Sequence, residues 1–210
     1  MKKNNFKGNI NVSTVIIIVL LTIIIVGFGV EKFGEQGKTS SGAGAKNGNT
    51  ADDLAKSLVG KPAPDFSLAD RDGNVYTNDN LKGKRVVLFF NEGLMCYPAC
   101  WNQMMEFPKD KRFDQSDVAV FSVVADTKES WQKAVEKMPE MGAVKALFDT
   151  ERIASKDFQM LSAPSSMHSG NLPGHTYVVI DKDGIVRYVL DDPKMAINNG
   201  TVYSEIEKLK

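Results

Sequence analysis

The chain has 210 residues, and its 26 Lys and Arg residues balance 26 Asp and Glu residues. A neutral chain offers no electrostatic reason to bind nucleic acid, so we expect no nucleic-acid partner. Beyond the N-terminal region about 160 residues remain, which is the size of one ordinary domain with a proper core.

The N-terminal region carries an uncharged apolar run over 12–30, long enough to cross a bilayer as a helix. Lys2, Lys3 and Lys7 precede this run, which favours a cytoplasmic N-terminus. We therefore predict a short cytoplasmic segment over 1–11, a single transmembrane anchor over 12–30, and an extracytoplasmic remainder. A cleaved signal peptide is the alternative, although its apolar region is usually shorter.

The segment 31–53 is rich in Gly, Ser, Asn and Thr, which predicts a flexible linker. The globular domain then occupies 54–210. An exterior compartment permits disulfides, so it favours redox use of closely spaced cysteines.

Strand-like and helix-like segments alternate along the domain. Continuous apolar runs of strand length are typical of central strands buried on both faces. The alternation predicts an α/β fold, with a mixed central sheet flanked by helices and a hairpin formed by its last two strands. We expect strands at 75–76, 85–90, 119–125, 145–148, 175–181 and 185–190, and helices at 54–58, from Pro98 to Pro108, after Thr127, at 151–160 and at 205–210.

Cys96 and Cys100 are the only cysteines, and they lie between the strand at 85–90 and the helix expected from Pro98. Two thiols at this spacing can close a disulfide, attack an oxidant or hold a soft metal ion. A helix N-terminus lowers the pKa of a nearby thiol, which favours a reactive pair. A purely structural disulfide is the alternative, but so small a loop removes little entropy from the unfolded chain.

Three short motifs follow one another along the domain: GKPAPDF at 60–66, LKGK at 81–84 and VIDKDG at 179–184. In this order they resemble the alkyl hydroperoxide reductase C / thiol-specific antioxidant family of peroxiredoxin-like redoxins, over about residues 58–190. The resemblance implies a thioredoxin-like fold and a thiol-dependent oxidoreductase that needs no cofactor. It also implies a hydroperoxide or protein-disulfide substrate and an external thiol as electron donor.

Two positions depart from the family pattern. Tyr97 stands where the family has a threonine near the active cysteine, and His175 stands where it has an arginine. Both family residues bind hydroperoxide, so their replacement shifts the expectation toward protein thiols, while the family match still favours a peroxidase.

We expect Cys96, Cys100 and His175 to be the catalytic residues, with His175 as base or thiolate partner. Alignment to the family favours Cys100 as the attacking thiol, whereas comparison with thioredoxin favours Cys96. Four further residues are expected to line the substrate site: Tyr97, Pro98, Trp101 and Pro173, the last lying near the usual place of a cis-proline.

Two other functions share this pattern. Copper chaperones of cytochrome oxidase assembly have the same fold, a Cys-x-x-x-Cys pair and a distant histidine, so Cys96, Cys100 and His175 are alternative copper ligands. An inactive redoxin used as a docking module is the third possibility.

Overall fold

The computed structural model describes residues 50–210, which belong to one compact unit. The predicted segments 1–11 and 12–30, and nearly all of the linker at 31–53, lie outside the described residues. Within the described part, no helix is long and apolar enough to cross a membrane.

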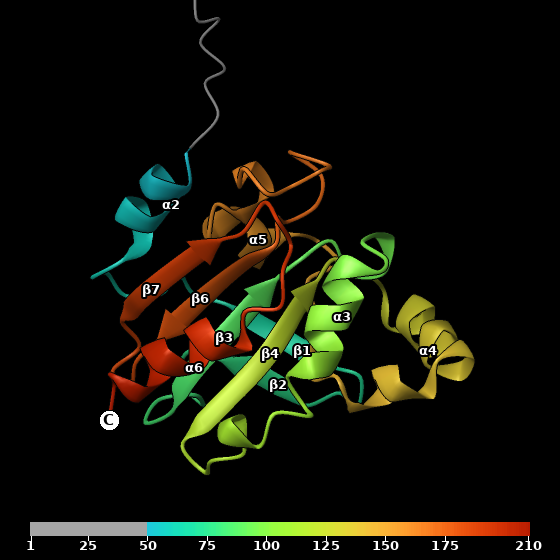
Figure 1. Cartoon of the computed structure of the whole chain (residues 1–210), viewed down its shortest axis with the longest axis horizontal. Helices are drawn as coiled ribbons and strands as arrows, with labels where there is room; N and C mark the ends of the chain where they lie inside the picture. Colours follow the sequence, from blue (N-terminus) through green and yellow to red (C-terminus); the bar gives the residue numbers. More distant parts are fainter. Residues whose placement is uncertain (1–49) are drawn as a thin grey trace, which may run out of the picture. The chain divides into compact units, whose positions relative to one another are not determined.

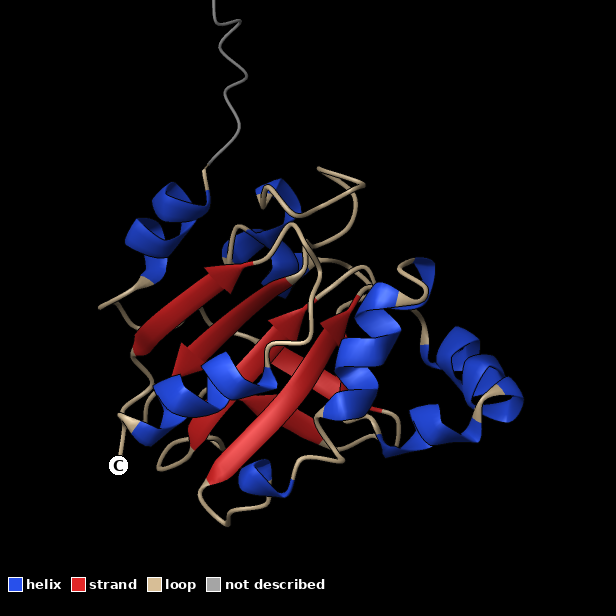
Figure 2. Cartoon of the chain, viewed as in Figure 1, coloured by secondary structure: helices blue, strands red, loops and turns tan. Residues whose placement is uncertain are grey.

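Within residues 50–210, seven strands form one mixed sheet in the order β2-β1-β5-β4-β3-β6-β7 (Figure 2). The interior strand β3 pairs in parallel with β4 and antiparallel with β6, as the mixed-sheet prediction requires. The strands are β1 Ser67–Asp70, β2 Val75–Thr77, β3 Arg85–Phe90, β4 Val118–Val124, β5 Ala146–Phe148, β6 Thr176–Ile180 and β7 Val186–Asp191.

Helices cover both faces of this sheet (Figure 1). They are α2 Ala51–Leu58, α3 Ala99–Glu106, α4 Lys128–Lys137, α5 Ile153–Asp157 and α6 Asn199–Glu207. Every residue of β3 is buried, and its side chains alternate between the two faces. Val87 and Phe89 pack with α3 and α6, whereas Leu88 and Phe90 pack on the face that α2 and α5 cover.

A threonine caps the start of two helices. Helix α4 begins after Thr127 as the sequence predicts, whereas α2 begins at Ala51, three residues before the predicted start at 54. Thr50 Oγ1 accepts a hydrogen bond from the Asp53 backbone, and Thr127 Oγ1 accepts one from the Ser130 backbone. These bonds satisfy donors that a helix start leaves free.

Three further helix boundaries differ from the prediction. The last helix starts at Asn199 rather than 205, because burial of Val202 and Ile206 against the sheet overrides the weak propensity of Asn and Gly. The helix predicted over 151–160 shortens to α5, since residues in left-handed conformation stand at both of its ends. Pro98 is the N-cap of α3 rather than its first helical residue.

Candidate active site

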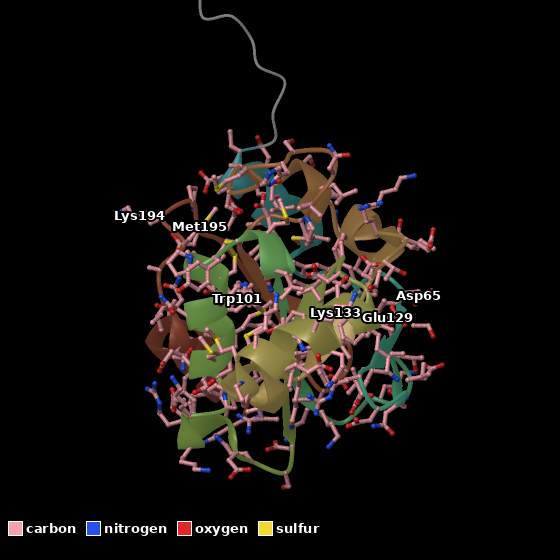
Figure 3. All side chains as sticks on the ribbon, turned by 90° about the vertical axis from the view of Figure 1, so that its right-hand side faces the viewer. Asp65, Trp101, Glu129, Lys133, Lys194 and Met195 are labelled. Atoms are coloured by element: carbon pink, nitrogen blue, oxygen red, sulfur yellow. A yellow bond between two sulfur atoms is a disulfide. The ribbon has the colours of Figure 1, made fainter. Side chains whose placement is uncertain are left out.

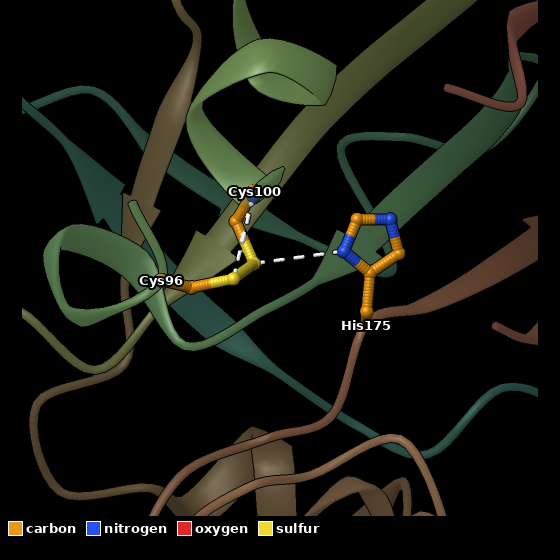
Figure 4. Close-up of side chains that lie close together, drawn as sticks. All are labelled: Cys96, Cys100 and His175. Atoms are coloured by element: carbon orange, nitrogen blue, oxygen red, sulfur yellow. Dashed lines mark hydrogen bonds between the residues drawn. A yellow bond between two sulfur atoms is a disulfide. The ribbon is translucent and has the colours of Figure 1, made fainter. Parts of the chain in front are cut away.

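The two cysteines lie where β3 passes into α3 and form a disulfide, with their Cα atoms 5.3 Å apart (Figure 4). Cys96 ends the short 3-10 turn Gly93–Met95, and Cys100 lies in the first turn of α3. The redox-capable pairing predicted from their spacing is therefore present in the fold.

The turn before Cys96 depends on a glycine and a buried carboxyl group. Gly93 has φ of +59°, and a Cβ atom placed there would overlap the Asp126 carboxylate. That carboxylate accepts a hydrogen bond from the Leu94 backbone at 3.0 Å, and burial raises the pKa of Asp126. Gly93 therefore lets the chain approach the end of β4 closely enough to fix the cysteine loop.

The environments of the two sulfur atoms differ. Cys96 is 7% exposed, and its Sγ accepts the backbone N–H of Cys100, at the N-terminus of α3, over 3.3 Å. Cys100 is fully buried. Since a thiolate is stabilised by N–H groups at a helix N-terminus, this geometry favours Cys96 as the less buried and more acidic thiol.

The sheet topology brings His175 beside Cys100. Strand β6 runs antiparallel to β3 with Phe90 opposite Thr176, so the residue before β6 lies next to the chain leaving β3. His175 Nδ1 is 3.5 Å from Cys100 Sγ, as Figure 4 shows. The imidazole is fully buried, and this burial lowers the pKa of His175 from 6.5 to about 4. At neutral pH it is therefore an uncharged base.

A chain of buried hydrogen bonds continues from the imidazole into the core. His175 Nε2 is 2.9 Å from the Tyr177 hydroxyl, which lies 2.9 Å from Gln103 Oε1. Gln103 Nε2 donates to Asn199 Oδ1 at 2.8 Å. The network joins β6, α3 and α6 behind the disulfide.

The residues predicted to line the substrate site are divided between surface and core. Tyr97 and Pro98 are exposed beside the disulfide. The Tyr97 ring packs edge-on against the Trp101 ring, with 5.2 Å between the ring centroids. Pro173 is buried, and the cis-proline expected there is wrong: among the described residues the cis peptide bond precedes Pro98.

The sequence prediction missed three residues of the site. Tyr177 lies two positions after His175 on the same face of β6, so strand periodicity could have indicated it. Met195, whose Sδ is 3.8 Å from Cys96 Sγ, comes from the loop after β7, whereas Trp101 comes from α3 (Figure 3). No local signal indicates Met195. Glu92 is the third. It directly precedes the turn that leads to Cys96, and its buried carboxylate holds that turn to another loop by accepting hydrogen bonds from the Met167 and His168 backbones.

The two sulfur atoms and an imidazole nitrogen of His175 lie within 4.8 Å of one another. The three residues named as alternative copper ligands thus come together in space. In the disulfide form, however, neither sulfur is a thiolate, which is the form that binds metal.

The profile of the AhpC/TSA family matches residues 59–189. Chloroplastic peroxiredoxin Q of Sedum lineare is 30% identical over 145 residues, which cover 66% of this chain and 72% of that protein. Chloroplastic peroxiredoxin Q of Oryza sativa subsp. japonica is 28% identical, covering 63% of this chain and 58% of that protein. A peroxiredoxin-like protein from Aquifex aeolicus superposes with a TM-score of 0.61 at 20% identity, covering 72% and 87%.

The family match and the cysteine pair mark the chain as a thiol oxidoreductase on a thioredoxin-like scaffold. Because the family profile covers more than half of its length, the chain belongs to the AhpC/TSA family. The resemblance seen in the sequence is thereby confirmed, and the copper-chaperone alternative is not favoured. The chain spans less than two thirds of the length of the rice relative.

Proposed function

We propose that the protein reduces hydroperoxides through a two-cysteine cycle within one chain. The observation that carries this proposal is the asymmetry of the pair: Cys96 faces the helix N-terminus near the surface, and Cys100 is buried beside His175. The relatives named peroxiredoxin Q support the same class of substrate.

In this cycle the Cys96 thiolate attacks the terminal peroxide oxygen. The O–O bond breaks, Cys96 becomes a sulfenic acid, and the departing alkoxide or hydroxide takes up the equivalent of the proton released when Cys96 ionised. Cys100 then gives its proton to His175 and attacks the Cys96 sulfur. The S–S bond forms, the S–O bond breaks, and the departing hydroxide takes that proton back from His175 to become water. An external dithiol returns two electrons and two protons to the disulfide.

His175, which stands where the family has an arginine, is neutral and therefore supplies no fixed positive charge to orient a peroxide beside the sulfurs. We therefore expect slower peroxide reduction than in relatives that keep the arginine. Protein-disulfide exchange at Cys96 is the competing use of the same pair, and the exposed Met95 and Tyr97 side chains leave room for a protein partner beside it.

A titration of the reduced full chain with hydrogen peroxide and with cumene hydroperoxide tests the proposal. We expect one Cys96–Cys100 disulfide per peroxide consumed, measured as the loss of two hydrogen atoms by intact mass. If neither peroxide forms the disulfide while the reduced protein cleaves insulin disulfides, the pair works in disulfide exchange instead. Metal analysis of the same reduced preparation detects copper if the chaperone alternative is correct.

We also propose that the apolar run at 12–30 anchors the domain outside the membrane, on the strength of its length and the preceding lysines. The full chain is expected in the membrane fraction and resistant to carbonate extraction, whereas deletion of 1–33 releases it. The matched control replaces the three N-terminal lysines by glutamine, which keeps the apolar run and should preserve membrane association. Recovery of a shortened, soluble chain would indicate a cleaved signal peptide.

A further inference from the structure

In the buried network behind the disulfide, the groups at the two ends determine which partner donates in each hydrogen bond. At one end the backbone N–H of Asn198, which can only donate, lies 2.7 Å from Gln103 Oε1. At the other end the carbonyl of Glu106, which can only accept, receives Asn199 Nδ2 at 3.1 Å. Each amide group is thus fixed in orientation, with Gln103 Oε1 turned toward Tyr177 and Gln103 Nε2 donating to Asn199.

The same reasoning assigns the Tyr177 hydroxyl as a hydrogen-bond donor. The Tyr177 hydroxyl faces two acceptors, Gln103 Oε1 at 2.9 Å and the Ala196 carbonyl at 3.3 Å. If the hydroxyl proton pointed to His175 instead, the lone pairs of the Tyr177 oxygen would face the lone pairs of both acceptors, which is unfavourable. The hydroxyl therefore donates into the network, and burial raises the pKa of Tyr177 so that it keeps its proton.

We propose that Tyr177, held by Gln103 and Asn199, is a positioning residue that fixes His175 as the Nε2–H tautomer and leaves the Nδ1 lone pair facing Cys100. Since the Tyr177 oxygen is free only to accept, the nitrogen 2.9 Å away must donate to it. The other ring nitrogen, 3.5 Å from Cys100 Sγ, is then the acceptor. The proton taken from the Cys100 thiol in the resolving step goes to that nitrogen.

This inference deepens the proposed function, because it names the atom that receives the Cys100 proton. It is nevertheless measurable without any peroxide. Reduced full-length protein labelled with nitrogen-15 in its histidines is examined at neutral pH by long-range proton–nitrogen correlation. We expect His175 Nε2 at the shift of a protonated ring nitrogen and Nδ1 at that of an unprotonated one.

Tyr177→Phe removes the acceptor while keeping the ring that stacks on Phe89. Loss of one hydrogen bond should lower the preference for the Nε2–H tautomer by about fivefold. Tyr203→Phe is the matched control, because it removes a hydroxyl from a tyrosine that packs on Phe113 instead. It should leave the His175 shifts unchanged.

An Nδ1–H tautomer in the reduced wild-type protein would overturn the proposal, as would a Tyr177→Phe spectrum that matches the wild type. If Tyr177→Phe does not fold, Gln103→Leu replaces it. That variant removes one of the two acceptors that the Tyr177 hydroxyl faces and keeps the Ala196 carbonyl, so it should shift the tautomer ratio partway. A wild-type Nε2–H tautomer with no peroxide-driven disulfide formation would reject the peroxidase and keep the tautomer assignment.

Discussion

Cys96→Ser is expected to lose peroxide turnover by about three orders of magnitude or more, because it removes the attacking thiolate. Cys100→Ser should lose steady-state turnover to the same extent but still consume one equivalent of peroxide. It then stops with one oxygen atom added at Cys96, since the resolving thiol is absent. Coupled peroxide assays with a dithiol donor measure turnover, and intact mass measures the added oxygen.

Ala99→Ser is the control for these variants. It adds a hydroxyl at the first helical position between Pro98 and Cys100 and keeps both thiols, so near wild-type turnover is expected. If Cys96→Ser consumes the single equivalent and Cys100→Ser does not, the roles of the cysteines are reversed. Full turnover in both serine variants would show that the cysteines are not catalytic.

The sequence predicts most of the scaffold, because strong local signals mark it. The unbroken apolar run of β3, the Thr127 cap of α4 and the turn at Asp183 and Gly184 each act within a few residues of the element they define. The start of α6 escapes such reasoning, because burial against a distant part of the sheet decides it.

For the candidate site, the sequence predicts how the cysteines and His175 come together but does not predict the contact made by Met195. The proximity of Cys96 and Cys100 follows from four positions of chain, and the placement of His175 follows from the antiparallel pairing of β3 and β6. The contact of Met195 with Cys96 spans 99 positions through an irregular loop, and no periodicity in the sequence indicates it. Catalytic roles for these residues stay predictions until the variants are measured.

Acid is expected to destabilise the folded protein through His175. The folded-state pKa is about 4, whereas the unfolded chain titrates near 6.5, so the unfolded state binds more protons between these values. The free energy of unfolding should therefore fall as the pH falls from 6.5 toward 4, by about 3 kcal/mol from this residue alone. Urea unfolding of the oxidised full chain, followed by tryptophan fluorescence over a pH series, measures the loss.

Carboxyl groups also titrate in this range, so the difference from His175→Asn isolates the contribution of the imidazole. That variant is expected to be less stable near neutral pH but to lose about 3 kcal/mol less on acidification. Equal pH dependence in the wild type and His175→Asn would mean that His175 titrates normally in the folded state.

The division of the core by the sheet has a practical consequence for experiments on this protein. The chain enters the domain through α2, whose Leu54 and Leu58 pack on one face, whereas the disulfide belongs to the core on the opposite face. A tag, dye or solid support attached ahead of Thr50 thus joins the domain on the face away from the thiols. Immobilisation through the N-terminal side should accordingly leave the cysteine pair open to electrodes, reductants and partner proteins.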